Sequence, residues 1–288
     1  MKLVLSRKGF DQGSGGAPSP IFEDGSLFSI PIPDGRTRQR YGDMRHGLHD
    51  IGEVVSHLTK GRYTGRSPAH VDPDLHKERI DRRDGWRPAF GQTGAAQRHL
   101  ENQGVGTGDI FLFFGWFRDV SRNVDGIWRP TPGGRDIHAF HGWMQIGEVL
   151  DLSSGRATDW LHYPWLCDHP HVSRGAEPNN TIYIASETLA LPGCIASAVA
   201  GGGRMSRLTE ATTLTAQRQP KKSVWSLPDW FAPDSGRSLS YHVDHNRWTT
   251  TETGVNLKTV GRGQEFVIDI GDDKRALDWV SALITSAI

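Results

Sequence analysis

Two short runs of the chain carry the residue types that bind a transition metal. His70 and Asp72 stand two residues apart, and in an extended backbone such a pair points to the same side of the chain. His169 and His171 repeat this spacing around Pro170. The first pair with one histidine of the second would form a two-histidine, one-carboxylate site, which leaves positions open for substrate or oxygen on non-haem iron. These residue types predict a divalent metal, with iron or manganese ahead of zinc.

A second interpretation of the same residues stays open. Asp72-Pro73-Asp74 is also a common turn composition, in which an aspartate caps the next backbone segment and the histidines are ordinary core residues. If a metal is bound, the other ring nitrogen of each histidine should meet a carbonyl or carboxylate, and Asp74 and Glu177 are the nearest acidic candidates. Residues 60–94 are too long for a plain connection, which indicates a functional loop.

The N-terminal stretch carries another group of charged residues. Arg7, Lys8 and Asp11 follow the apolar run Leu3–Leu5 and precede a glycine-rich turn at 13–16. Two cations and a carboxylate beside flexible backbone can hold an anion or a polar ring, and an ionised Asp11 can act as a base or nucleophile. We therefore predict that these three are catalytic and line the same cavity as the 69–74 loop. A structural ion-pair cluster would give the same pattern.

Three further residues could bind a substrate. Trp116 offers a flat surface on which a base could stack, and Arg118 a cation for a phosphate. Gln145 could pair with the edge of a base, whereas Glu148 falls on the opposite face of a regular strand. The alternative is that Trp116 belongs to the core and that Arg118 is solvated.

Composition excludes several classes of protein. The 33 Lys and Arg residues balance 33 Asp and Glu residues, so any grip on nucleic acid must come from a local patch. Two cysteines, Cys167 and Cys194, make neither a disulfide framework nor a zinc motif. No apolar run has the length of a membrane span or of a signal peptide, so we expect a cytoplasmic protein that does not enter membranes.

Periodicity predicts one α+β domain over residues 1–288. We expect a bent, mostly antiparallel sheet or a small barrel with flanking helices, in which strands 109–117 and 143–150 are antiparallel neighbours. Ten Trp and 34 Gly residues suit such a β-rich, loop-rich fold. The other predicted elements are a hairpin over 21–34, helices near 47–58, 93–103 and 273–286, and strands near 181–185, 248–251 and 265–269.

Several segments together resemble a known family. They are SRKGFDQGSGGAPSPIFEDG at 6–25 with SIPIPD at 29–34, AHVDPDL at 69–75, GDIFLFFGWFR at 108–118, HGWMQIGEVL at 141–150, HPHV at 169–172, NTIYIAS at 180–186 and GQEFVIDIG at 263–271. This set is similar to the nucleotide modification associated domain 3 family, and the similarity implies a role among systems that modify nucleobases in DNA. The central strands also resemble PUA-like modules such as ASCH and EVE, whose small barrel holds a nucleobase.

Two functional hypotheses follow from the residues and the resemblance. The first is an enzyme that acts on a nucleobase, a nucleotide or a similar small molecule by metal-assisted chemistry, with an oxidative reaction as one form of it. The second is a non-catalytic reader that binds a modified base in a PUA-like pocket. A third role, as a subunit that binds other proteins of a modification pathway, would show neither property alone.

Overall fold

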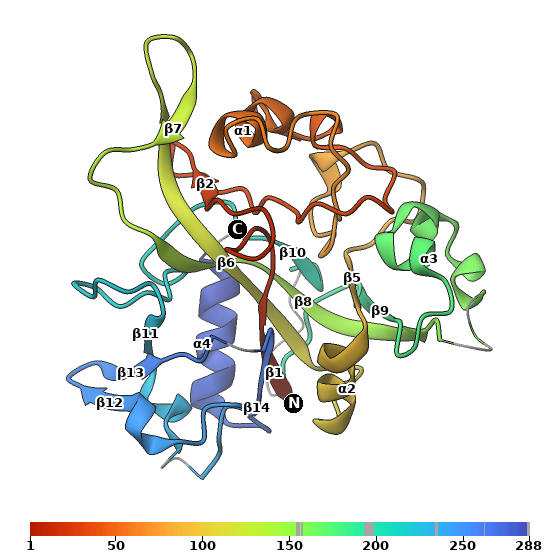
Figure 1. Ribbon diagram of the computed structural model, residues 1–288. Helices are drawn as coiled ribbons and strands as arrows, with labels where there is room; N and C mark the ends of the chain where they lie inside the picture. The colour runs from red at the N-terminus through yellow and green to blue at the C-terminus, as the bar shows by residue number, and fades with distance from the viewer. Residues whose placement is uncertain (154–155, 157, 193–198, 234–235, 262, 287–288) are drawn as a thin grey trace.

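A nine-stranded mixed sheet forms the centre of the molecule (Figure 1). The computed structural model describes residues 1–288 except 154–155, 157, 193–198, 234–235, 262 and 287–288, so the expectation for Cys194 lies outside the described residues. The main path of the sheet runs in the order β14-β1-β6-β8-β9-β5. Its strands are β14 (Glu265–Asp269), β1 (Lys2–Arg7), β6 (Ile110–Arg122), β8 (Ile137–Asp151), β9 (Thr181–Ala185) and β5 (Ala89–Gln92). Three short strands join its sides, namely β2 (Ser19–Ile21) and β7 (Trp128–Pro130) on β6, and β10 (Gly202–Arg204) on β8.

The central strands are apolar throughout because both faces of the sheet are covered. Leu3 and Leu5 pack on one face with α4 (Lys274–Thr285), whereas Val4 packs on the other face near α2 (Gly94–Asn102). The run 110–114 alternates between the same two cores. Burial on both faces explains why this segment reads as a continuous apolar run instead of an alternating one.

The predicted pairing of the two long strands is confirmed. Strands β6 and β8 are antiparallel, with Ile110 opposite Gln145 and Phe117 opposite Ile137, and their register shifts between Phe113 and Phe114. The far half of β8 leaves β6 and pairs with β9 after a second shift. Such irregularities bend a sheet. Among the described residues the sheet stays open, so the expected α+β fold with a bent, mostly antiparallel sheet is confirmed and its barrel alternative is not, while β1 and β2 run parallel to β6.

Smaller elements surround this sheet. They are the sheet of β11 (Val224–Leu227), β13 (Gly254–Lys258) and β12 (Trp248–Thr251), the hairpin of β3 (Arg45–His46) and β4 (His49–Asp50), and the helices α1 (Ile51–Leu58) and α3 (Pro170–Arg174). The predicted helix at 47–58 begins later, at Ile51, because Asp50 caps it and Leu48 lies fully exposed in the hairpin turn. Helices α2 and α4 match their predictions. Among the described residues, no helix has both the length and the apolar content needed to cross a membrane.

The loop that carries His70 and Asp72 is fastened at several points. Isolated backbone bridges join Ala69 to Pro33, Pro68 to Arg40, and Asp74 to Ala89. On the neighbouring segment, His169 caps α3 and Pro170 is its first residue, so His171 lies on a helix and not on the extended chain that its spacing predicted. Figure 1 shows α3 beside β5 and β9, which brings the two histidine segments together.

Candidate metal centre

Asp72 lies among three histidine rings. Its Oδ2 is 3.7 Å from His70 Nε2 and 3.7 Å from His171 Nε2, and its Oδ1 is 3.5 Å from His169 Nε2. All four side chains are buried. The structure therefore brings together the four residues that the sequence singled out as metal ligands.

The ring of His70 is oriented by a carboxylate. His70 Nδ1 lies 3.0 Å from Asp34 Oδ2, so Nδ1 carries the proton and donates it, and the lone pair of Nε2 faces Asp72. Burial lowers the pKa of His70, but the hydrogen bond to Asp34 and the nearby charge of Asp72 raise it above its usual value. The contact with His70 in turn holds the pKa of Asp34 well below its usual range.

The ring of His171 is oriented by an amide whose own direction is fixed. Asn180 Nδ2 donates to the backbone oxygens of His171 and Gly175, both at 2.8 Å. Its Oδ1 therefore faces His171 Nδ1, 2.7 Å away, and must accept a proton from it. The Nε2 lone pair of His171 then points at Asp72. Burial lowers the pKa of His171 to about 3, so this ring is neutral.

His169 has the opposite tautomer. Its Nδ1 accepts a hydrogen bond from the backbone nitrogen of His171 at 3.3 Å, which places the proton of the neutral ring on Nε2. That proton faces Asp72 Oδ1 at 3.5 Å without a hydrogen bond between them, and Oδ1 accepts from the backbone nitrogen of Gly91 at 2.7 Å. His169 therefore supports the carboxylate instead of offering a lone pair to an ion.

Three donor atoms remain for a cation, namely His70 Nε2, His171 Nε2 and Asp72 Oδ2. One donor atom from each residue lies within 4.8 Å of the other two. None of the three can hydrogen-bond to another while both histidines are neutral, because all three are acceptors. Burial raises the pKa of Asp72, but the histidines hold it well below its usual range, so the carboxyl is ionised. The donor set fits the predicted two-histidine, one-carboxylate site.

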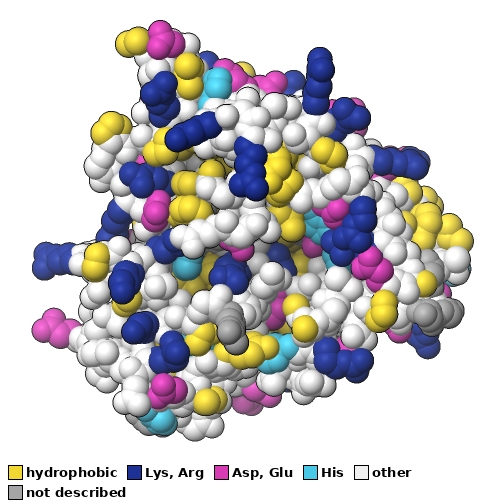
Figure 2. All heavy atoms as spheres, in the orientation of Figure 1, with side chains coloured by type: hydrophobic (Ala, Val, Ile, Leu, Met, Phe, Trp, Pro, Cys, Tyr) yellow, Lys and Arg dark blue, Asp and Glu magenta, His cyan; other side chains and the backbone are white. Residues whose placement is uncertain are grey.

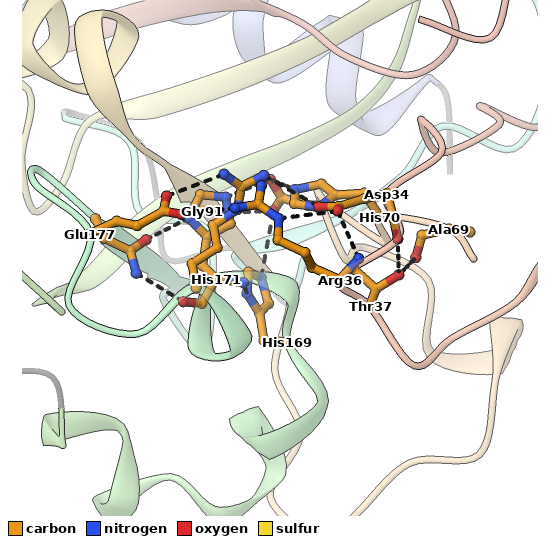
Figure 3. Close-up of polar contacts among 12 residues, drawn as sticks. Asp34, Arg36, Thr37, Ala69, His70, Gly91, His169, His171 and Glu177 are labelled. Carbon is orange, nitrogen blue, oxygen red and sulfur yellow. Dashed lines mark hydrogen bonds and ion pairs between the residues drawn. The ribbon is translucent and has the colours of Figure 1, made fainter.

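Two arginines, which a second acid also contacts, hold Asp34 in place (Figure 3). Arg36 and Arg174 each contact both Asp34 and Glu177. Glu177 thus reaches the histidines only through these arginines. Asp74, the other expected partner, binds Arg82 and Trp86 instead, so the prediction that Asp74 and Glu177 orient the histidines directly is wrong.

Gly91 allows α3 to approach the sheet. A Cβ atom at this position would lie 2.2 Å from Cδ2 of His171, which no side chain could tolerate. The same residue donates its backbone N–H to Asp72. Gly91 lies in no pattern that pointed to a site, and Asp34 and Asn180 fall within the family motifs at 29–34 and 180–186, although their residue types did not indicate their role. Gly91 pairs with Ile182 in the sheet, and Ile182 follows Asn180 by two residues. This pairing places Gly91 and Asn180 side by side.

The N-terminal charges do not form one cluster. Successive residues of a strand point to opposite faces, so Arg7 and Lys8 diverge. Lys8 Nζ donates to Glu265 at 2.7 Å and lies over the ring of Phe90, the neighbour of Gly91. Arg7 and Asp11 line a separate pocket, which does not include residues 69–74. The expectation of one cavity shared by all three residues and that loop is therefore wrong.

The separate pocket has a volume of about 590 Å³ and contains Trp116 and His138. Lys222 Nζ lies 4.3 Å from the centroid of the Trp116 ring. Arg118 pairs instead with Asp136, at 3.4 Å. Gln145 is buried in the core, where both ends of its amide bond to the backbone of Ala190, so it has no free edge for a base.

Charge on the molecular surface is mixed. Figure 2 shows basic side chains scattered over one face with acidic ones between them, and histidines in the hollow near its centre. This agrees with the net charge of zero and gives no broad basic field. Cys167 is partly buried, and burial raises the pKa of its thiol, so the thiolate is disfavoured.

Comparison with known proteins identifies the family. The family model described as nucleotide modification associated domain 3 matches residues 2–269, which is nearly the whole chain. The chain therefore belongs to this family, as its motifs indicated. No curated protein and no solved structure matches the chain.

Proposed function

We propose that this member of the nucleotide modification associated domain 3 family is a metal-dependent enzyme that acts on a nucleobase, a nucleotide or a similar small molecule. His70, Asp72 and His171 would hold iron or manganese in preference to zinc. One observation carries the proposal: three buried acceptor atoms face one another, and their histidine tautomers are set by Asp34 and Asn180. A shared cation satisfies all three acceptors at once without a change of protonation.

The protein residues around this centre have distinct tasks. Three ligands leave coordination positions open, and a metal there would polarise a bound oxygen or support an oxidative reaction. Asp34 and Asn180 hold the proton of the neutral His70 and His171 rings on Nδ1, so that Nε2 of each ring keeps its lone pair. Gly91 and His169 hold Oδ1 of Asp72, which leaves Oδ2 directed at the histidines.

Elemental analysis of the purified protein tests this proposal. Wild-type protein should bind close to one equivalent of iron or manganese, which a chelator removes. Asp72→Asn should lose the metal, and turnover of nucleobase and nucleotide substrates should be lost with it. Asp74→Asn is the matched control, because Asp74 is also buried but pairs with Arg82. A wild-type protein that binds none of the three metals after reconstitution would refute the proposal.

A reader function is the second candidate, and the Trp116 pocket favours it. Its volume suits a base-sized ligand, and it combines an aromatic surface with Arg7 and Lys222. Binding would require Lys222 to move from the face of Trp116. Tight binding of a modified oligonucleotide by metal-free protein, weakened in Trp116→Leu and unaffected in Asp72→Asn, would favour the reader over the enzyme.

A further inference from the structure

A second pocket borders Asp72, and its lining carries positive charge, whereas the metal centre presents acceptor atoms for a cation. It is lined by Asp72, Pro73, His76, Arg79, His141 and Arg204, among other residues. Arg79 lies on the single turn that follows the metal-binding loop, and Arg204 ends the short strand β10. His70, His169 and His171 do not line it. The Asp72–Pro73 segment therefore has histidine acceptors on one side and guanidinium groups on another.

Arg79 forms no ion pair with any described residue, although the charge of Asp74 acts on it from a distance. The residue is only 8% exposed, and its Nε has no hydrogen-bond partner. Burial lowers the pKa of Arg79 to about 10, so the side chain remains charged at neutral pH. Its guanidinium lies over the ring of Phe28, 4.9 Å from the centroid. The ring covers the guanidinium and leaves its N–H edge free for a ligand.

Within the described part of the chain, neither arginine has a direct ion-pair partner, although the carboxylate of Asp72 lines the same pocket. Among the described residues, no carboxylate lies within ion-pair distance of Arg79 or Arg204, and the nearby Asp74 is engaged by Arg82. A buried charge without a partner is strongly unfavourable, so its presence indicates a ligand that supplies the opposite charge.

The histidines of the pocket also have free ring nitrogens. Nε2 of His76 and Nε2 of His141 are buried without partners, although both residues are about 94% buried. His76 Nδ1 lies 3.3 Å from the exposed Glu78 but does not form a hydrogen bond with it. Each ring can donate one N–H to a bound acceptor.

The size of the pocket limits what can enter. Its interior measures about 20 Å³, and one water molecule needs roughly 10–15 Å³ on this measure. One or two oxygen atoms of a larger anion can enter, but a base cannot. Two guanidinium groups with two imidazoles form the donor set that binds a carboxylate or phosphate group.

We propose that Arg79 and Arg204, with His76 and His141, form an oxyanion-binding pocket that holds an acidic group beside the metal centre. The anion belongs either to a nucleotide phosphate or to the carboxylate of an acidic co-substrate. Its use in a reaction rests on the proposed function, but the binding of an oxyanion does not. The pocket fixes one end of the substrate so that the neighbouring part reaches the face of Asp72.

Inorganic phosphate is the first probe, measured by calorimetry on chelator-treated protein at constant ionic strength. Wild-type protein should bind phosphate saturably. Arg204→Gln should weaken binding at least about tenfold, since a charge-assisted hydrogen bond is lost. Arg79→Met should abolish binding and melt at a higher temperature than wild type in anion-free buffer, because a buried unpaired charge is removed. Arg207→Gln, on an exposed residue close in sequence, is the control and should bind as wild type does.

Competition identifies the source of the anion. A nucleoside 5′-monophosphate that displaces phosphate far better than its nucleoside points to a nucleotide, whereas tighter binding of succinate points to a carboxylate co-substrate. Absence of saturable binding of both phosphate and succinate, or unchanged binding in both Arg204→Gln and Arg79→Met, overturns the inference. Protein that binds phosphate but no metal rejects the proposed function and keeps this pocket, and protein that binds metal but no oxyanion does the reverse.

Discussion

The two sides of the Asp72–Pro73 segment differ in the charge that each would accept from a ligand. Towards His70 and His171, acceptor atoms face one another and a cation would join them. Towards Arg79, a buried cation has no carboxylate partner among the described residues. Around this one segment, acceptor atoms face one another on one side and donor groups without acceptors lie on the other, which is the arrangement expected of a site that receives two different ligands.

The two sides of this segment also differ in how firmly their histidine rings are held before a ligand binds. His70 and His171 are fixed by hydrogen bonds at their remote ring nitrogens, so the lone pairs are aimed before any ligand arrives. His76 has no hydrogen-bond partner at either ring nitrogen. We infer that the metal side is preorganised, and that the oxyanion side becomes ordered when its ligand binds. The predictions below test this difference.

The largest effect is expected from Gly91→Ala. The added Cβ would overlap the His171 ring, so α3 must shift and the acceptor group must break. Metal affinity should fall by more than about 100-fold, and the free energy of unfolding by roughly 1–3 kcal/mol. Gly106→Ala, where nothing lies within 4 Å of the added atom, is the control for both measurements. Phosphate binding should change less than metal binding, and an equal loss of both would contradict separate sites.

A smaller loss is expected from Asp34→Asn. The substitution keeps the size of the side chain but removes the charge that orients His70 and pairs with Arg36 and Arg174. Metal affinity measured by titration should fall about 10- to 100-fold, the usual effect of removing such a partner. Asp24→Asn, in an exposed turn, should leave it unchanged. If affinity survives in Asp34→Asn, preorganisation of His70 is not important for binding.

Acid should lower the free energy of unfolding through His141, which lines the oxyanion side. Burial, and then the charge of Arg79, lower the pKa of His141 to about 3, well below its value in the unfolded chain. Its contribution to stability is therefore complete above about pH 6.5 and is lost as pH falls towards 3. In metal-free and anion-free buffer, the free energy of unfolding of His141→Gln should fall less steeply below pH 6.5 than that of wild type, by about 1 kcal/mol per pH unit. Equal slopes by urea titration would show that His141 titrates normally.

The smallest effect is expected from His169→Gln. If His169 is not a ligand, the substitution removes its contact with Asp72 Oδ1 and its cap on the nitrogen of His171, while Gly91 continues to hold that oxygen. Metal affinity should then fall about two- to tenfold. His171→Gln should abolish binding under the same conditions. A complete loss in both variants would make His169 a ligand.

Local patterns predicted most of the fold. The stripes of α2 and α4 and the apolar run of β6 each lie within one segment, so the sequence contained the necessary information. Whether the edges of a sheet close into a barrel depends on pairings between distant segments, so the sequence left the choice between a bent sheet and a barrel open. For Arg7 and Lys8 the error was local, because alternation along a strand already separates neighbouring side chains.

The candidate site was predictable only in its donors. His70, Asp72, His169 and His171 were visible because imidazole and carboxylate side chains two residues apart can share a metal, but the sequence did not tell which of His169 and His171 offers a lone pair. The residues that orient them were not, since Asp34 and Asn180 come from two distant segments and serve through position rather than type. Arg79 and Arg204 were hidden for the same reason, as an unpaired arginine is defined by what surrounds it in space.

Strand β1 has a consequence for how the chain folds. It pairs with β6 on one side and with β14 on the other, with Lys2 opposite Asp269. At ordinary rates of synthesis, β14 leaves the ribosome roughly 10–50 s after β1. Until then, one edge of an apolar strand has no hydrogen-bonding partner, and such an edge readily pairs with other chains. The sheet that carries Gly91 is thus completed late and over long sequence distances, so we expect slow folding that depends on protection of the nascent chain.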